Sequence, residues 1–120
     1  MARVAIAHIK SVVAAEFDMP EDIMTSPQQD RPTAHVRQVA MAIAYQLTPC
    51  SPAVIGRVFG GRDRTTVLYA RDVVADRREK DSDLNHRIQR LVEMLRPAPV
   101  PRPEVQLSFL VGPLFDRMAA

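Results

Sequence analysis

The chain of 120 residues is 47% hydrophobic and 25% charged, which suits one domain with a modest core. Its single cysteine cannot form an internal disulfide, and it has no G-x-x-x-x-G-K-[ST] loop, acid pair or metal-ligand cluster, so we expect no enzyme, nucleotide, cofactor or metal. The net charge of +2 is concentrated, because residues 31–71 carry six arginines against Asp63 alone; this is a footprint for phosphates or, more simply, a solvated charged surface.

Apolar spacing predicts three helices in the first 47 residues. The first covers about residues 3–17, and a short second helix opens at Pro20 and ends before Ser26. A third covers residues 32–47. Its predicted inward face consists of Val36, Val39, Ala40, Ile43 and Leu47. Its predicted outer face consists of Arg37, Met41 and Tyr45.

A helix-turn-helix pattern follows. Ser51 and Pro52 are typical of an N-cap and a first helical residue, and an apolar stripe then runs to Gly60-Gly61, which suits a sharp turn. Asp63 is placed to cap the next helix, over about residues 63–78, whose exposed first turn carries hydroxyl and guanidinium donors. Its predicted inward residues are Val67, Ala70 and Val74.

The last predicted helix covers residues 84–95 and is followed by two further segments. Residues 97–103 alternate proline with small or charged residues, which is typical of a stiff extended linker. Residues 104–120 form an apolar tail that is too short, and too broken at Gly112-Pro113, to span a bilayer. The tail either folds back on its own domain or binds a protein partner. Its large apolar side chains are Leu107, Phe109, Leu110, Leu114 and Phe115.

Two runs in this pattern resemble a known family. Residues 37–44 (RQVAMAIA) and 55–68 (IGRVFGGRDRTTVL), with Leu47-Thr48 between them, resemble the C-terminal DNA-binding domain of the bacterial replication initiator DnaA. More loosely, the resemblance extends from about Ile6 to Leu95. It implies an all-α, DnaA/Trp-repressor-like helix-turn-helix domain of about six helices, here residues 1–96, with double-stranded DNA as its partner.

The resemblance also implies roles for individual residues. It assigns Arg37 to a phosphate and Gln38 to a supporting contact, and it makes Asp63 an acceptor from cytosine in addition to a cap. Thr66 is assigned to a thymine methyl or a phosphate, or it bonds only to the backbone. The complete set of predicted DNA-binding residues is Arg31, Arg37, Gln38, Pro52, Ala53, Arg62, Asp63, Arg64, Thr65, Thr66 and Arg71.

Two positions depart from the family pattern. The family usually has histidine where this chain has Arg64, a longer and permanently charged side chain that favours guanine. In the family, an arginine of the loop before the third helix enters the minor groove. The ungapped position here is Gln29, and Arg31 follows two residues later, so we choose Arg31; a plain surface loop is the alternative.

Two functions fit these features. The first is a cytoplasmic transcription regulator, an activator that binds DNA and recruits RNA polymerase, a sigma-like factor or a co-activator through the tail. Similar small DnaA-like activators imply prophage-like or gene-transfer-agent genes as its targets. The second is a replication-associated factor that binds or competes for DnaA-type origin sites. Because no ATPase motif is present, we expect a stand-alone binding domain and favour the regulator.

Overall fold

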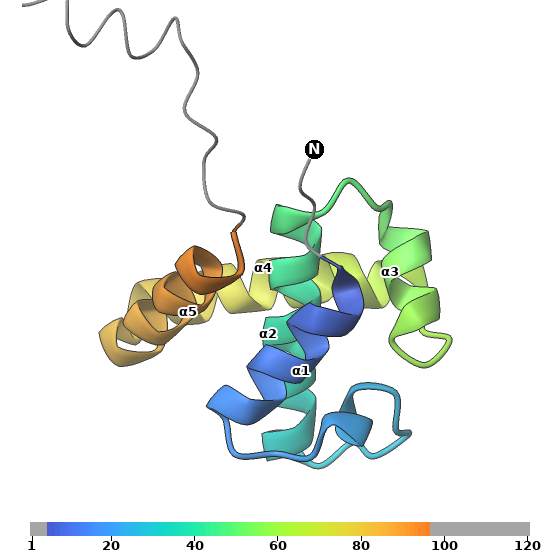
Figure 1. The fold of residues 1–120 in the computed structure, drawn as a ribbon, viewed down its shortest axis with the longest axis horizontal. Helices are drawn as coiled ribbons and strands as arrows, with labels where there is room; N and C mark the ends of the chain where they lie inside the picture. Colours follow the sequence, from blue (N-terminus) through green and yellow to red (C-terminus); the bar gives the residue numbers. More distant parts are fainter. Residues whose placement is uncertain (1–4, 97–120) are drawn as a thin grey trace, which may run out of the picture.

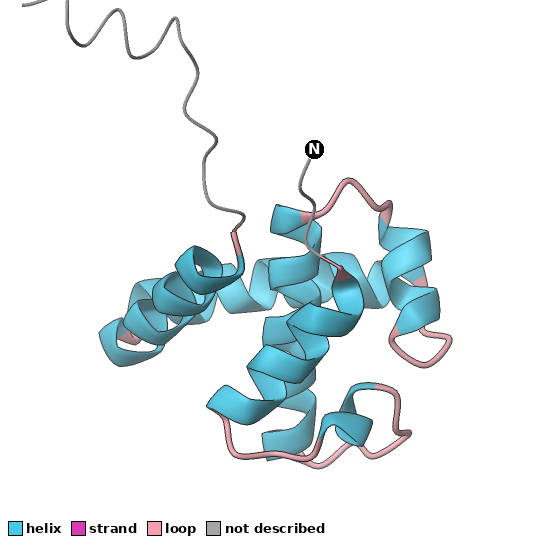
Figure 2. Cartoon of the chain, viewed as in Figure 1, coloured by secondary structure: helices cyan, strands magenta, loops and turns pink. Residues whose placement is uncertain are grey.

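The structure, a computed structural model, describes residues 5–96, and every regular element in that range is helical (Figure 2). In chain order the elements are α1 (Ile6–Glu16), the 3₁₀ turn η1 (Glu21–Met24), α2 (Arg31–Leu47), α3 (Pro52–Val58), α4 (Arg64–Lys80) and α5 (Ser82–Leu95). The predicted all-α class is therefore confirmed, although the second of the six expected helices is a single 3₁₀ turn. The predicted linker and tail lie outside the described residues.

The central element is α2. In Figure 1 it stands upright, with α1 in front of it and α4 crossing behind it, while α3 and α5 lie toward opposite ends of α4. Each of the other elements contacts α2. The core therefore surrounds this one helix, and the shorter elements are held in place by packing against it.

Side-chain caps mark the starts of three helices, and those at Ser51 and Asp63 confirm the prediction. The hydroxyl of Ser51 accepts a hydrogen bond from the backbone N–H of Val54 at 3.3 Å, directly before Pro52 at the first position of α3. Asp81 caps α5 by accepting from the N–H of Leu84 at 3.1 Å. Asp63 caps α4. These side chains satisfy backbone donors that a helix cannot satisfy internally, and so they fix where each helix begins.

The inward-facing residues of the last two helices are buried. On α4 the three predicted residues are all buried in the core. On α5 four regularly spaced leucine and isoleucine side chains are also buried there. These residues are Val67, Ala70 and Val74 on α4, and Leu84, Ile88, Leu91 and Leu95 on α5. Their burial removes apolar surface from water and leaves the polar faces of both helices outward.

One part of the prediction for α2 is wrong. Arg37 and Met41 were expected on the outer face, but they are only 4% and 1% exposed. Tyr45, at 36%, is the only one of the three on the surface. The reason is tertiary: α1, η1, α3, α4 and α5 all pack against α2. A one-sided apolar stripe is the pattern of a helix packed on one face, whereas α2 is packed on several.

Candidate nucleic-acid interface

The turn between α3 and α4 depends on glycine. Gly60 and Gly61 have φ angles of +90° and +73°, which side chains with a Cβ rarely adopt. Gly56 allows a close approach, because a Cβ there would lie 2.1 Å from the carbonyl oxygen of Arg62. In return, the backbone N–H of Arg62 donates to the carbonyl oxygen of Gly56 at 2.8 Å. The angle between α3 and α4 is therefore fixed by direct backbone contact.

The start of α4 presents polar groups to solvent. The carboxylate of Asp63 accepts from the backbone N–H of Thr65 at 3.1 Å and from the hydroxyl of Thr65. These hydrogen bonds from Thr65 lower the pKa of Asp63, so the cap remains ionised. Arg64 and Thr65 are exposed, and Thr66 is half-buried. The predicted cap is confirmed, and the contact of Asp63 with cytosine remains a prediction.

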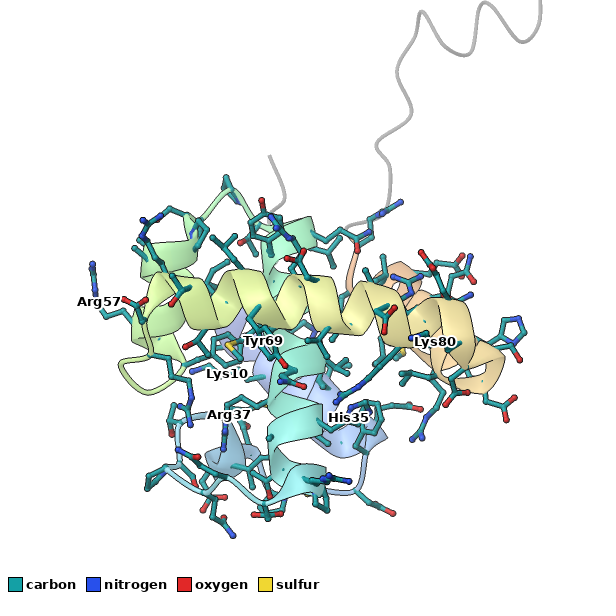
Figure 3. The ribbon with its side chains drawn as sticks, turned by 180° about the vertical axis from the view of Figure 1, so that it is seen from behind. Lys10, His35, Arg37, Arg57, Tyr69 and Lys80 are labelled. Atoms are coloured by element: carbon teal, nitrogen blue, oxygen red, sulfur yellow. The ribbon has the colours of Figure 1, made fainter. Side chains whose placement is uncertain are left out.

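A surface hollow of about 370 Å³ separates α3 from this helix start. It brings together Ala53, Arg62, Asp63 and Arg64, which were predicted to bind DNA, and adds Arg57. Pro52 lies beside Ala53 in the first turn of α3. Arg57 is exposed, and Figure 3 shows it projecting away from the body of the protein. In helix-turn-helix docking, side chains at these positions can reach base edges and the flanking backbone.

Two arginines hold the loop of residues 25–30 against the helix-turn-helix. Arg37 donates from Nε to the carbonyl oxygen of Ile23 at 3.1 Å and from Nη2 to that of Gln28 at 2.8 Å. Arg62 donates from Nη2 to the carbonyl oxygen of Ser26 at 2.6 Å. Burial lowers the pKa of both arginines, and the positive charge of Arg62 adds to the effect on Arg37. The loop therefore has a fixed conformation at the edge of the candidate interface.

A second surface hollow, of about 360 Å³, lies between this loop, α2 and the first turns of α4. Four of the predicted DNA-binding residues line it: Arg37, Gln38, Arg62 and Thr66. Neither Arg37 nor Arg62 forms an ion pair within residues 5–96, because both guanidinium groups donate to backbone carbonyl groups. The hollow is thus electropositive, which suits an anion.

The remaining predicted residues have partners of different kinds. Arg71 is engaged within the protein: its Nε pairs with Asp72 at 2.9 Å and its Nη1 donates to the hydroxyl of Tyr45 at 3.1 Å. The side-chain oxygen of Gln38 accepts from Arg77 at 3.1 Å. Arg31 is exposed at the first position of α2. Arg71 can therefore reach DNA only by exchanging its present contacts, whereas Arg31 is exposed at the end of the loop.

Two residues of this surface were not predicted. Arg57 lines the first hollow and Tyr69 lines the second. The signal for Arg57 was its place in the basic segment, and the signal for Tyr69 was its position one helical turn after Thr65 and Thr66. The five apolar residues predicted to bind a partner, Leu107, Phe109, Leu110, Leu114 and Phe115, lie outside the described residues. Within residues 5–96, no helix combines the length and apolar character needed to cross a membrane.

A short capped helix, a glycine turn and a second capped helix with exposed donors define a helix-turn-helix DNA-binding domain. The family described as bacterial dnaA protein helix-turn-helix matches residues 6–74, and the chain belongs to this family. The expected resemblance is thereby confirmed.

Known relatives give the same result. The chain is 42% identical, over 94 residues, to the chromosomal replication initiator protein DnaA of Azoarcus sp. (strain BH72) and to that of Aromatoleum aromaticum. It is 40% identical, over the same length, to that of Laribacter hongkongensis. These alignments cover 78% of this chain but only 20% of each relative. The chain therefore spans about a fifth of the length of the initiators that it matches.

Proposed function

We propose that the protein is a sequence-specific double-stranded DNA-binding transcription regulator. The observation that carries the proposal is the start of α4, where Asp63, Arg64 and Thr65 are exposed together, beside the first hollow, which is also lined by Arg57. Placed in a major groove, this turn offers a carboxylate acceptor, a guanidinium fork and a hydroxyl to base edges. Arg31 and the loop of residues 25–30 lie next to this turn, since Arg62 holds the loop, and would follow the neighbouring backbone or minor groove.

Arg64 favours a regulator over a factor that shares the initiator's own sites. A guanidinium fork suits the O6 and N7 acceptors of guanine, whereas the histidine usual in this family is shorter and carries fewer donors. A competitor for initiator sites needs the initiator's base preference. An altered preference instead directs the protein to different sites, as expected for control of particular genes. Binding to chromosomal DNA would place the protein on the nucleoid.

The tail would supply the second half of a regulator. Full burial of one large apolar side chain against a partner contributes about 1.5 to 3 kcal/mol to binding. The tail has five such side chains: Leu107, Phe109, Leu110, Leu114 and Phe115. We propose that this segment recruits RNA polymerase, a sigma-like factor or a co-activator. The proline-rich residues 97–103 suit a spacer that separates recruitment from DNA reading.

A replication-associated role is the alternative. Those proteins are replication initiators, and a chain sharing their helix-turn-helix can occupy or compete for origin sites if its base preference is unchanged. Chromatin immunoprecipitation with sequencing separates the two. We expect peaks upstream of one or a few operons, with transcription of those operons falling when the gene is deleted. Peaks confined to the replication origin would reject the regulator.

A further inference from the structure

The two tyrosines of this chain have different surroundings. The hydroxyl of Tyr45 accepts a hydrogen bond from Arg71, whose guanidinium also lies 5.2 Å from the centre of the Tyr45 ring. Tyr69 is 62% exposed, and its hydroxyl has no hydrogen-bond partner within residues 5–96. The Tyr45 side chain therefore interacts with another residue of the domain, whereas Tyr69 presents an aromatic ring and a hydrogen-bond donor to solvent.

Tyr69 lies at the edge of the candidate interface. It follows Thr65 and Thr66 by one turn of α4, on the side that faces α2 and the loop of residues 25–30. Figure 3 shows it beside α4 and close to α2. It lines the same hollow as Arg37 and Arg62. The first turn of a recognition helix reaches base edges, so the next turn lies where the phosphates border the groove.

The charge of this hollow matches a phosphodiester. The guanidinium groups of Arg37 and Arg62 donate to carbonyl oxygens and form no ion pair in the described part of the chain, although the charge of Asp30 acts on Arg37 from beyond ion-pair distance. The hydroxyl of Thr66 and the phenol of Tyr69 add neutral donors. An anion with several acceptor oxygens is the complement of such a surface.

We propose that Tyr69 is a DNA-contact residue that donates its phenolic hydrogen to a non-bridging oxygen of one backbone phosphate seated over this hollow. The proposal rests on the proposed function, since it requires DNA to dock on α4. It adds to the predicted set a residue that holds the backbone without reading a base.

The test compares Tyr69→Phe with Tyr45→Phe, because each change removes only a hydroxyl. Dissociation constants are measured for the full chain on its selected site and on a random duplex of equal length. Tyr69→Phe should bind both duplexes about 3- to 10-fold more weakly, as expected for one hydrogen bond to a charged group. Tyr45→Phe should not weaken binding by more than about twofold, because Tyr45 does not line this hollow. The slope of affinity against salt should not change, because a neutral hydroxyl displaces no counterion.

A scan of single methylphosphonate substitutions along the site locates the contact. At one phosphate, the loss of affinity caused by the neutral group should be smaller in Tyr69→Phe than in the wild type, because the variant has already lost the hydroxyl contact; at the other phosphates the two losses should be equal. Wild-type affinity of Tyr69→Phe, or additive losses at every phosphate, would overturn the proposal while the proposed function stands. If the wild type binds no duplex, the proposed function fails and this contact fails with it.

Discussion

Arg62 donates a hydrogen bond from Nη2 to the carbonyl oxygen of Ser26 at 2.6 Å, across 36 positions of sequence. The contact joins the turn before α4 to the loop before α2. Gly60 makes it possible, because a Cβ at this position would lie 2.6 Å from the carbonyl oxygen of Thr25. The loop and the recognition helix are therefore held as one surface, and whatever the loop contributes to DNA binding depends on a residue of the turn.

The first prediction concerns this coupling. Arg62→Met should lower the free energy of unfolding by about 1 to 2 kcal/mol, since it removes hydrogen bonds from a charged donor but keeps the apolar stem. It should also weaken the effect of Arg31→Ala on DNA affinity, because the loop of residues 25–30, once its hydrogen bond to Arg62 is lost, no longer holds Arg31 in place. Chemical denaturation and a double-mutant cycle of dissociation constants measure the two effects.

Arg57→Met is the matched control for Arg62→Met, since Arg57 is an exposed arginine on the neighbouring helix α3. It should leave the free energy of unfolding within about 0.5 kcal/mol of the wild type and should not couple to Arg31→Ala. If Arg31→Ala lowers DNA affinity equally in the wild-type and Arg62→Met backgrounds, the contact between Arg62 and Ser26 does not position the loop.

The second prediction concerns specificity. Arg64→Ala should cost about 1 to 3 kcal/mol of binding free energy on the preferred site and much less on random DNA, because a base-edge contact is lost. Arg64→His should move the selected site toward that of the histidine-containing relatives at one base position. Binding selection with sequencing compares the three proteins. An unchanged selected sequence for Arg64→His would contradict the assignment of Arg64 to a base.

The third prediction concerns pH. The Nδ1 of His35 accepts from Arg77 at 2.5 Å, and burial, followed by the charges of Arg77 and Arg87, lowers the pKa of His35 below 6.5, while Asp81 opposes this. The unfolded chain then binds more protons than the folded one below about pH 6.5. His35 should therefore support full stability above pH 6.5 and reduce it as the pH falls through 6.5 toward the folded pKa.

Denaturant unfolding between pH 5 and 8 measures this dependence. In His35→Gln the fall in stability through this window should be smaller than in the wild type, whereas His86→Gln, at an exposed position of α5, should retain it. The carboxylates whose pKa is lowered, Asp30 and Asp63, lose their contribution only near and below pH 4, so they do not obscure the window. Identical profiles for the wild type and His35→Gln would refute the assignment.

The fourth prediction concerns the tail. Truncation after Arg96 should leave DNA affinity in vitro nearly unchanged but abolish transcriptional output, because the segment that holds the partner is lost. Gel shifts and a reporter assay on the same truncation measure the two properties. Unfolding or loss of DNA binding would make the tail part of the domain core, and normal activation would remove the basis for a partner.

The local features of the helix-turn-helix could be predicted from sequence because each depends on neighbouring residues. A cap such as Asp63 acts on a backbone donor two residues later, and Gly60 and Gly61 specify a turn through their own φ angles. The apolar stripe of α5 likewise reflects one-sided packing. These interactions are short in sequence, so a pattern of residue types was sufficient to locate them.

The tertiary structure decided the parts that depend on residues far apart in the chain. Arg37 looked like a surface residue, yet α2 is covered on several sides and its guanidinium is turned to the carbonyl oxygens of Ile23 and Gln28. Arg62 and Ser26 meet only because α2 packs against α4. Periodicity records which residues share a face of one helix, but only packing determines how many faces are buried and which distant carbonyl groups a charged side chain must satisfy.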